Sequence, residues 1–218
     1  MPLDIKICGL KTIDAVEAAL DGGATHLGFI FFPKSPRHVE PAQAALLRDD
    51  VGGRAKIAAV TVDADDAALD EIVAAVRPDL LQLHGMETPE RVAEVKARYG
   101  LPVMKAFSLR EAADLHRVDA YRSVADHLLF DAKPPAGALL PGGNGVVFDW
   151  TILAGYGGPF FLSGGLQAGN VGEALRVTRP MGLDISSGVE RAPGVKDISL
   201  IEQFFRAVRT AQAASLAA

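Results

Sequence analysis

The chain has very little cysteine, and this scarcity excludes several kinds of protein. Cys8 is the only cysteine among 218 residues, so neither an internal disulfide nor a multi-cysteine metal cluster can form. The five histidines show no His-x-x-x-His or similar spacing, and we therefore expect no metal site. A chain without disulfides suits a reducing compartment, which predicts a cytoplasmic protein.

Long apolar runs and an excess of positive charge are also missing. No run approaches the length that spans a bilayer, and the N-terminus reaches the charged Asp4 without the apolar core of a signal peptide. The net charge of −5 argues against a nucleic-acid backbone as the main partner. We therefore expect no membrane and no nucleic acid as partner, and only a local anion site remains possible.

What the chain does contain is a repeated alternation of short β-prone apolar runs with longer segments of helical period. This alternation is typical of a parallel sheet, and 49% hydrophobic residues are enough for a substantial core. Eight strand-like runs occur: Asp4–Gly9, Thr25–Phe31, Lys56–Val62, Leu80–His84, Pro102–Ala106, His127–Asp131, Phe160–Ser163 and Gly182–Ser186.

Helices are indicated between the strands by apolar stripes and capping residues. After the third strand, apolar residues recur at i, i+3, i+4 and i+7 until Pro78 ends the pattern. Thr88 is the expected N-cap of the next helix, with Gly100 at its C-terminal end, and Asn170 with Glu173 has the spacing of a capping box. The two apolar stripes with the clearest period are Leu69, Ile72, Val73 and Val76, and Ile198, Ile201, Phe204, Phe205 and Val208.

Eight strand and helix units without a Pro/Gly/Ser-rich linker predict a single (β/α)₈ barrel domain over residues 1–218. A doubly wound open sheet is the alternative, but no Gly-x-Gly-x-x-Gly follows the first strand and no Walker sequence occurs. The one long irregular segment, Ala132 to Gly145, is predicted to form a mobile lid.

Barrel enzymes build their sites at the carboxyl ends of the strands, where this chain places several reactive or polar residues. Strand alternation puts Lys6 and Cys8 on one face of their strand, and likewise Gln82 and His84 on theirs. Alternation alone leaves open which face points inward. His84 is as readily a satisfied polar residue as a ligand contact.

Adjacent glycine-containing loops after the last two strands predict a phosphate site. Many barrels bind phosphate there, through backbone N–H groups and a short extra helix. A single Gly-Gly pair would be no more than a strand-to-helix turn, but here both loops carry the signal. The residues concerned are Gly164, Gly165, Ser186, Ser187 and Gly188, and Gln82, His84 and Asp184 are further candidates for binding the substrate.

Cys8 and Asp131, at the ends of their strands, are the candidate catalytic residues. A thiolate that takes a proton and a carboxylic acid that gives one form an acid/base pair, provided that the site lowers the pKa of the cysteine and raises that of the aspartate. Lys6, on the face of Cys8, is the candidate for lowering the pKa of the thiol. Arg37, on a loop stiffened by Pro33 and Pro36, suits a carboxylate or an oxyanion, the alternative being a solvated surface arginine.

Taken together, these motifs resemble the phosphoribosylanthranilate isomerase family of tryptophan biosynthesis over essentially the whole chain. One departure is Gln167-Ala168-Gly169, where the family often has a proline; it concerns only how the following helix starts. The motifs are Lys6-Ile7-Cys8-Gly9-Leu10, Gly28-Phe29-Ile30-Phe31 leading to Ser35-Pro36-Arg37, Leu81-Gln82-Leu83-His84-Gly85, Leu129-Phe130-Asp131, Pro141-Gly142-Gly143-Asn144-Gly145 with Phe148-Asp149-Trp150, Ser163-Gly164-Gly165-Leu166, and Asp184-Ile185-Ser186-Ser187-Gly188-Val189-Glu190.

The resemblance implies an Amadori rearrangement that converts N-(5-phosphoribosyl)anthranilate to 1-(2-carboxyphenylamino)-1-deoxyribulose 5-phosphate. Asp131 would protonate the ring oxygen as general acid, and Cys8 would remove the C2 proton as general base. No cofactor is implied, because the protonated imine is the electron sink. The loops after the last two strands would hold the phosphate, and Arg37 would meet the anthranilate end or the enolamine oxygen.

Other functions remain as alternatives. Another phosphosugar-binding barrel enzyme would need histidine and carboxylate metal ligands, or lysine and glutamate, at its strand ends; a barrel that binds phosphorylated ligands without turnover is the non-enzymatic alternative. An isomerase serving both the tryptophan and histidine pathways would be expected to have aspartate in place of Cys8. A monomer is favoured, and a homodimer stays open.

Overall fold

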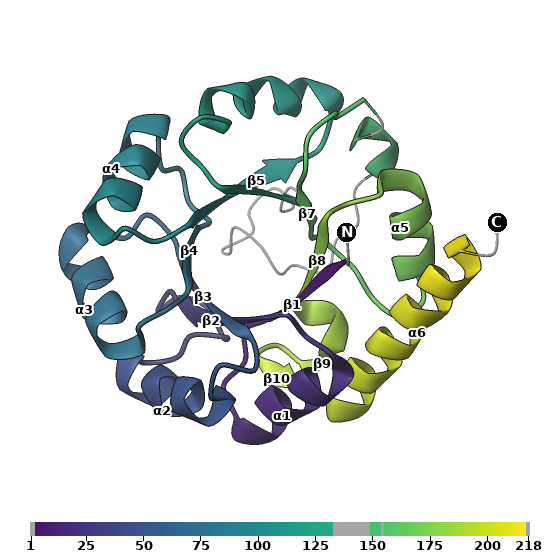
Figure 1. Ribbon diagram of the computed structural model, residues 1–218, viewed down its shortest axis with the longest axis horizontal. Coiled ribbons are helices and arrows are strands. Elements are labelled where there is room, and N and C mark those ends of the chain that lie inside the picture. The colour runs from purple at the N-terminus through teal and green to yellow at the C-terminus, as the bar shows by residue number, and fades with distance from the viewer. Residues whose placement is uncertain (1–2, 133–148, 154, 217–218) are drawn as a thin grey trace.

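The computed structural model describes residues 3–132, 149–153 and 155–216. Eight parallel strands form a closed barrel in sequence order, because each strand pairs with the next and β8 pairs with β1 (Figure 1). The strands are β1 (Asp4–Cys8), β2 (His26–Phe31), β3 (Lys56–Thr61), β4 (Leu80–Leu83), β5 (Val103–Leu109), β6 (His127–Ala132), β7 (Phe161–Leu162) and β8 (Gly182–Ile185). The predicted (β/α)₈ barrel is confirmed.

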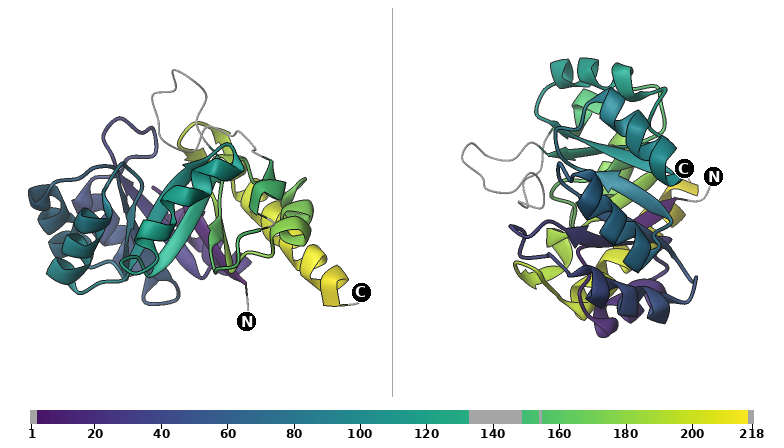
Figure 2. Two further views of the ribbon diagram at one scale, coloured as in Figure 1. Left: turned by 90° about the horizontal axis from the view of Figure 1, so that it is seen from above. Right: turned by 90° about the vertical axis from the view of Figure 1, so that its left-hand side faces the viewer.

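Helices surround the barrel on its outside (Figure 1). They are α1 (Ile13–Gly22), α2 (Pro41–Val51), α3 (Asp66–Val76), α4 (Pro89–Tyr99), α5 (Val171–Thr178) and α6 (Ile198–Leu216), with the 3₁₀ helices η1 (Ala112–Arg117), η2 (Asp119–Tyr121), η3 (Trp150–Leu153) and η4 (Ser187–Val189). Figure 2 shows the barrel from the side, with the strands beginning on the face turned toward the reader in Figure 1.

The connection between β5 and β6 is not an α-helix, although an α-helix was expected between successive strands. Its apolar residues, Leu115, Val118 and Tyr121, recur at every third position and all belong to the core or pack against it. A spacing of three matches the 3.0 residues per turn of a 3₁₀ helix, in which such side chains eclipse one another. The chain therefore forms η1 and η2 here.

The capping predictions are confirmed in part. The side chain of Thr88 accepts a hydrogen bond from Arg91 N at the start of α4, and Gly100 ends that helix with φ of 63°. Asn170 stands at the N-cap of α5, but its side chain makes no capping bond. It instead accepts from Gln167 N and donates to Gly165 O, both at 2.9 Å, so it braces the loop after β7. Ile198, predicted to lie on the buried stripe of α6, is 44% exposed.

Two hydrophobic layers show which strand side chains point into the barrel and which point toward the helices. One layer lies between the strands and the helices and includes Ile7, Phe29 and Phe130. The other fills the barrel interior, with Ala58, Met104, Leu129 and Phe161 among its members. Since neighbours along a strand point to opposite faces, the strand residues that alternate with the first layer point inward. The set that contains Lys6, Cys8, Gln82, Asp131 and Asp184 is therefore the inward one.

A short antiparallel hairpin that we did not predict follows β8. It consists of β9 (Glu190–Ala192) and β10 (Val195–Lys196), joined by Pro193 and Gly194. Gly194 has φ of 76°, and a Cβ atom there would lie 2.2 Å from Pro36 O, so the hairpin packs directly against the loop after β2. The Pro-Gly pair was the sequence signal for this turn.

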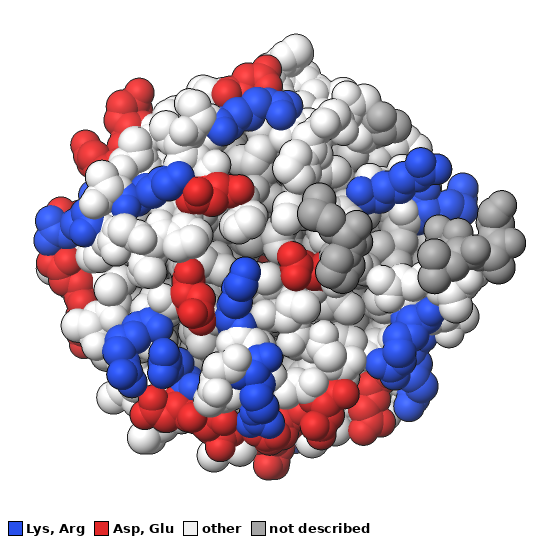
Figure 3. All heavy atoms as spheres, in the orientation of Figure 1, with Lys and Arg blue, Asp and Glu red and all other residues white. Residues whose placement is uncertain are grey.

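The charged side chains on the face where the strands begin are mixed in sign. Lys and Arg side chains lie among Asp and Glu side chains over this face, and acidic side chains gather along its lower edge (Figure 3). Among the helices of the described residues, none is both long enough and apolar enough to cross a membrane.

Candidate active site

Cys8 ends β1 with its side chain inside the barrel and is 5% exposed. Gly9 follows with φ of 78°, and the N–H groups of Gly9 and Leu10 both donate to Gly28 O, so the chain turns sharply at this point. A Cβ atom on Gly9 would lie 2.9 Å from Cδ of Arg37. The glycine after the cysteine is therefore needed both for the turn and for the close approach of Arg37.

Lys6 lies beside Cys8 and carries a buried ion pair with Asp184. Its Nζ is 2.8 Å from Asp184 Oδ1, and the lysine is fully buried. A Cβ atom placed on Gly28 would lie 2.9 Å from Cys8 Sγ and 3.1 Å from Lys6 Nζ, so both atoms border the same glycine. The absence of a side chain at Gly28 makes room for this pairing inside the barrel.

Lys6 lowers the pKa of the Cys8 thiol, as predicted, but this effect is smaller than the opposing effect of burial in the ligand-free protein. Burial raises the pKa of the Cys8 thiol above its usual value and outweighs the lowering by the Lys6 ammonium. The nearby Asp184 carboxylate also raises it, while Lys196 lowers it. The expectation of a lowered thiol pKa is therefore wrong for this state, because desolvation disfavours the thiolate more than two lysines favour it.

Gln82, His84 and Asp131 form a chain of polar groups along the barrel from β4 to β6. Gln82 Nε2 lies 3.1 Å from His84 Nδ1, and His84 Nε2 lies 3.4 Å from Asp131 Oδ2. The other carboxylate oxygen of Asp131 accepts the N–H of Ala132 at 2.8 Å. The structure thus brings Asp131 of β6 next to Gln82 and His84, which the sequence had placed together on another strand.

Arg37 is buried at the edge of this region and is not a solvated surface arginine. Its Nε and Nη2 donate to the two carboxylate oxygens of Glu190, each at 2.8 Å. Lys196 Nζ donates to Glu190 Oε1 at 2.8 Å as well as to Ser186 O and Ser186 Oγ. Burial alone raises the pKa of Glu190, but the bonds from Arg37 and Lys196 outweigh it and hold that pKa below its usual value. Sequence reasoning missed the part played by Glu190 and Lys196, because both lie on the unpredicted hairpin.

The loops after β7 and β8 touch each other through their glycines. Gly164 and Gly165 have φ of 90° and 64°, and a Cβ atom on Gly164 would lie 2.5 Å from Ala132 N and 2.9 Å from Asp131 Oδ1. A Cβ atom on Gly188 would overlap Leu166 O at 1.8 Å. Ser187 begins the short helix η4, and Ser186 Oγ donates to Cys8 O at 3.1 Å. The expected phosphate loops therefore meet next to both candidate catalytic residues.

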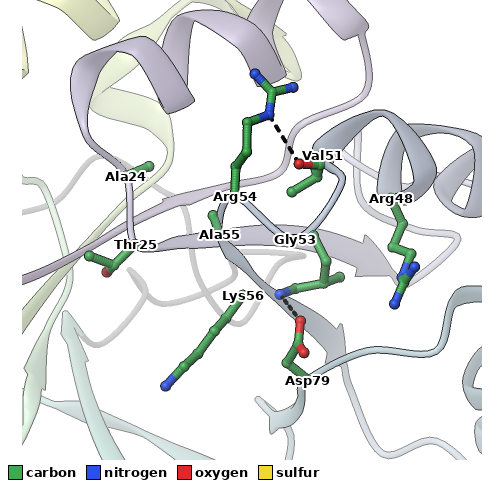
Figure 4. Close-up of a pocket in the computed structure, with 10 residues that line it drawn as sticks. Ala24, Thr25, Arg48, Val51, Gly53, Arg54, Ala55, Lys56 and Asp79 are labelled. Carbon is green, nitrogen blue, oxygen red and sulfur yellow. Dashed lines mark hydrogen bonds between the residues drawn. The ribbon is translucent and has the colours of Figure 1, made fainter.

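A separate hollow of about 360 Å³ lies at the start of β3, on the opposite end of the barrel (Figure 4). Two of its polar side chains bond to the protein itself: Asp79 accepts the N–H of Ile57 at 2.7 Å, and Arg54 donates to Val51 O at 3.1 Å. This hollow contains none of the predicted site residues. The predicted lid falls almost wholly on residues 133–148 and lies outside the described residues.

Comparisons with known proteins agree on one family. The family model described as N-(5'phosphoribosyl)anthranilate (PRA) isomerase matches residues 5–207. A curated relative from Mesorhizobium japonicum, named N-(5'-phosphoribosyl)anthranilate isomerase, is 68% identical over 214 residues, which cover 97% of this chain and 98% of the relative.

Solved structures of the same name share the fold. The phosphoribosyl anthranilate isomerase of Thermotoga maritima superimposes with a TM-score of 0.86 at 30% identity, covering 96% of this chain and 100% of the other. Another solved structure, named phosphoribosyl anthranilate isomerase in complex with reduced 1-(o-carboxyphenylamino)-1-deoxyribulose 5-phosphate, gives a TM-score of 0.83 at 29% identity with the same coverage.

Proposed function

Because the chain belongs to the N-(5'-phosphoribosyl)anthranilate isomerase family, we propose that it performs the Amadori rearrangement of that substrate with Cys8 and Asp131 as its catalytic residues. The single observation that supports this assignment most strongly is that both side chains point into the barrel at the carboxyl ends of β1 and β6. Two strands, β7 and β8, separate β1 from β6 on the shorter way round, so a small sugar bound between them would face one residue on each side.

In the first step Asp131 acts as general acid. Its proton passes to the ring oxygen of the ribose, the bond from C1 to that oxygen breaks with its electron pair going to the oxygen, and the nitrogen lone pair forms the protonated imine. A carboxylic acid in hydrogen-bond reach of the leaving oxygen supplies what this step requires. No cofactor takes part, since the imine nitrogen accepts the electrons of the next step.

In the second step Cys8 acts as general base and removes the proton at C2. The electrons of the C2–H bond form the enolamine, which tautomerises to the ketone. The thiol has a raised pKa in the ligand-free protein, but a protonated imine beside it adds the positive charge that favours the thiolate. Lys6 and Lys196 act in the same direction, so the base becomes available when the intermediate forms.

The phosphate is assigned to the loops after β7 and β8. Gly164, Gly165 and Gly188 leave the backbone uncovered by side chains, and Ser186 and Ser187 add hydroxyl groups beside η4. Arg37, oriented by Glu190, is assigned to the anthranilate carboxylate or the enolamine oxygen. Gln82, His84 and Asp184 line the interior below the substrate. We further propose that the protein is cytoplasmic and monomeric; the molar mass from light scattering of the purified protein tests the monomer, and cell fractionation tests the location.

The reaction is measured as loss of fluorescence when the protein meets freshly generated phosphoribosylanthranilate. We expect Cys8→Ser and Asp131→Asn each to lower kcat by about 10²- to 10⁴-fold, the usual worth of one general acid or base. Gln203→Met, on the exposed surface of α6, is the control and should keep full turnover. Decay no faster than the spontaneous background with the unaltered protein would reject the function, and full turnover in either variant would reject that residue.

A further inference from the structure

Gln82 determines which nitrogen of His84 carries the proton. Gln82 is fully buried, and its Nε2 lies 3.1 Å from His84 Nδ1. An amide NH₂ group is only a donor, so Nδ1 must accept, and a neutral imidazole then has its proton on Nε2. The amide therefore selects the Nε2–H tautomer of His84.

The Nε2–H group of His84 faces the candidate acid. Nε2 lies 3.4 Å from Asp131 Oδ2 and has no hydrogen-bond partner within the described part of the chain. Asp131 Oδ1 is already occupied by the N–H of Ala132 at 2.8 Å. Oδ2 is thus the oxygen left to carry the acidic proton, and it is the oxygen beside His84.

We propose that Gln82 and His84 are positioning residues for Asp131, with the Gln82 amide holding His84 as the Nε2–H tautomer and His84 donating to Asp131 Oδ2 once the carboxyl has given up its proton. This inference rests on the proposed role of Asp131 as general acid. The proton leaves Oδ2 for the ring oxygen of the sugar, and the charge that stays on Oδ2 receives the hydrogen bond. No proton enters or leaves the imidazole. A contact of 3.4 Å in the ligand-free protein shortens on substrate binding, as catalytic hydrogen bonds commonly do.

The opposite orientation of the amide makes a different prediction. If Gln82 Oε1 faced His84, it would accept from Nδ1–H, and Nε2 would present a lone pair to Asp131. That lone pair would hold the acidic proton on Asp131 and oppose its transfer. In the structure Nε2 faces His84, and Gln82 Oε1 has no partner among the described residues. Rotation would give Oε1 a partner but leave Nε2 without one, so each orientation makes one hydrogen bond and the two differ in the tautomer of His84 that they select.

The first test is ¹⁵N NMR of the histidine side chains of the ligand-free protein in mildly alkaline buffer, where neutral imidazoles predominate. The resonances of His84 are those that disappear in His84→Asn. We expect the pattern of the Nε2–H tautomer for His84. The Nδ1–H tautomer, or exchange between the two, would overturn the proposal. This measurement needs no turnover, so it is independent of the proposed function.

The second test is kinetic and uses Gln82→Met, which keeps the side-chain length but removes the amide. We expect kcat to fall about 10- to 100-fold, the worth of one hydrogen bond to a charged group, with a smaller change in KM. The same NMR measurement on this variant should show both tautomers, which a purely structural role would not produce. Gln203→Met is the matched control, since Gln203 is exposed and bonds Ser199 on the surface of α6.

The outcomes separate this inference from the function on which it rests. Loss of activity in Asp131→Asn together with an unchanged kcat in Gln82→Met would overturn the positioning role alone. Full activity in Asp131→Asn would overturn both. Loss in both variants, with the Nε2–H tautomer in the unaltered protein, is the result expected.

Discussion

Arg37 and Glu190 form a two-bonded ion pair although 153 positions separate them in the chain, with both N–O distances at 2.8 Å. The pair connects the loop after β2 to the hairpin after β8, and Lys196 adds a second cation to the same carboxylate. Both side chains are almost fully buried. Glu190 is therefore bonded to both cations of this cluster.

Replacing Glu190 by glutamine should destabilise the protein by about 3–5 kcal/mol, because it removes the buried carboxylate that bonds both Arg37 and Lys196. Arg37 would also lose its orientation, so KM for the substrate should rise. The free energy of unfolding in urea and the Michaelis curve measure the two effects. Glu173→Gln, on the exposed face of α5 and 4.0 Å from Arg176, is the matched control and should change neither. Equal stability of the two variants would show that the stability of the protein does not depend on the negative charge of Glu190.

The Cys8 thiol should react slowly with iodoacetamide in the ligand-free protein. Burial raises its pKa, so the rate should increase only at pH values above those at which the unfolded chain reacts. The single cysteine makes the assay specific, and protein in denaturant is the control. A midpoint below that of the unfolded chain would contradict the burial argument.

Two substitutions next to Cys8 should move the pKa of its thiol in opposite directions. Asp184→Asn removes a negative charge and should lower it, whereas Lys6→Met removes a positive charge and should raise it. The same alkylation profiles measure both shifts, and near-ultraviolet circular dichroism checks that each variant is folded. If the pKa of the Cys8 thiol is the same in Lys6→Met, Lys6 does not lower that pKa.

His26 should make the protein less stable in mild acid. Burial lowers its pKa from 6.5 to about 4, against the opposing charge of Asp4. A folded-state pKa below the unfolded value means that the stabilisation is present above pH 6.5 and is lost as the pH falls toward 4. The loss amounts to about 3 kcal/mol for this shift.

Unfolding in urea between these pH values measures the effect. His26→Gln should have a flatter pH dependence than the unaltered protein, with the remaining slope in the same direction because burial also lowers the pKa of His127. His116→Gln, at an exposed position on η1, should keep the full dependence. An identical slope in His26→Gln would show that His26 is not the titrating group.

Gly164→Ala should impair both folding and turnover. Its φ of 90° is unfavourable for alanine, and the added Cβ would lie 2.5 Å from Ala132 N and 2.9 Å from Asp131 Oδ1. We expect a loss of at least about 1 kcal/mol in stability, and a fall in kcat from displacement of Asp131. Gly169→Ala is the control within the same connection, since no atom lies within 4 Å of its added Cβ. An unchanged kcat in Gly164→Ala would show that this loop does not fix the position of Asp131.

The sequence by itself determined the eight strands, their order of appearance and the residues at most of their carboxyl ends, although β5 was predicted to end at Ala106 and continues to Leu109. These depend on local periodicity and on the alternation of side chains along a strand, which act within a few residues. The same alternation placed Lys6 with Cys8 and Gln82 with His84. Turn chemistry located Thr88 and Gly100 correctly for the same reason.

The tertiary structure decided everything that depends on contacts distant in the chain. It closed the barrel, turned Lys6, Cys8 and Asp131 inward, and brought Glu190 to Arg37. It also decided the pKa of Cys8, because desolvation is a property of the packed barrel and not of the neighbouring residue Lys6. Local patterns carry no information about burial by segments that are distant in the chain. In this protein that burial determines the pKa of Cys8 and the ion pair of Arg37.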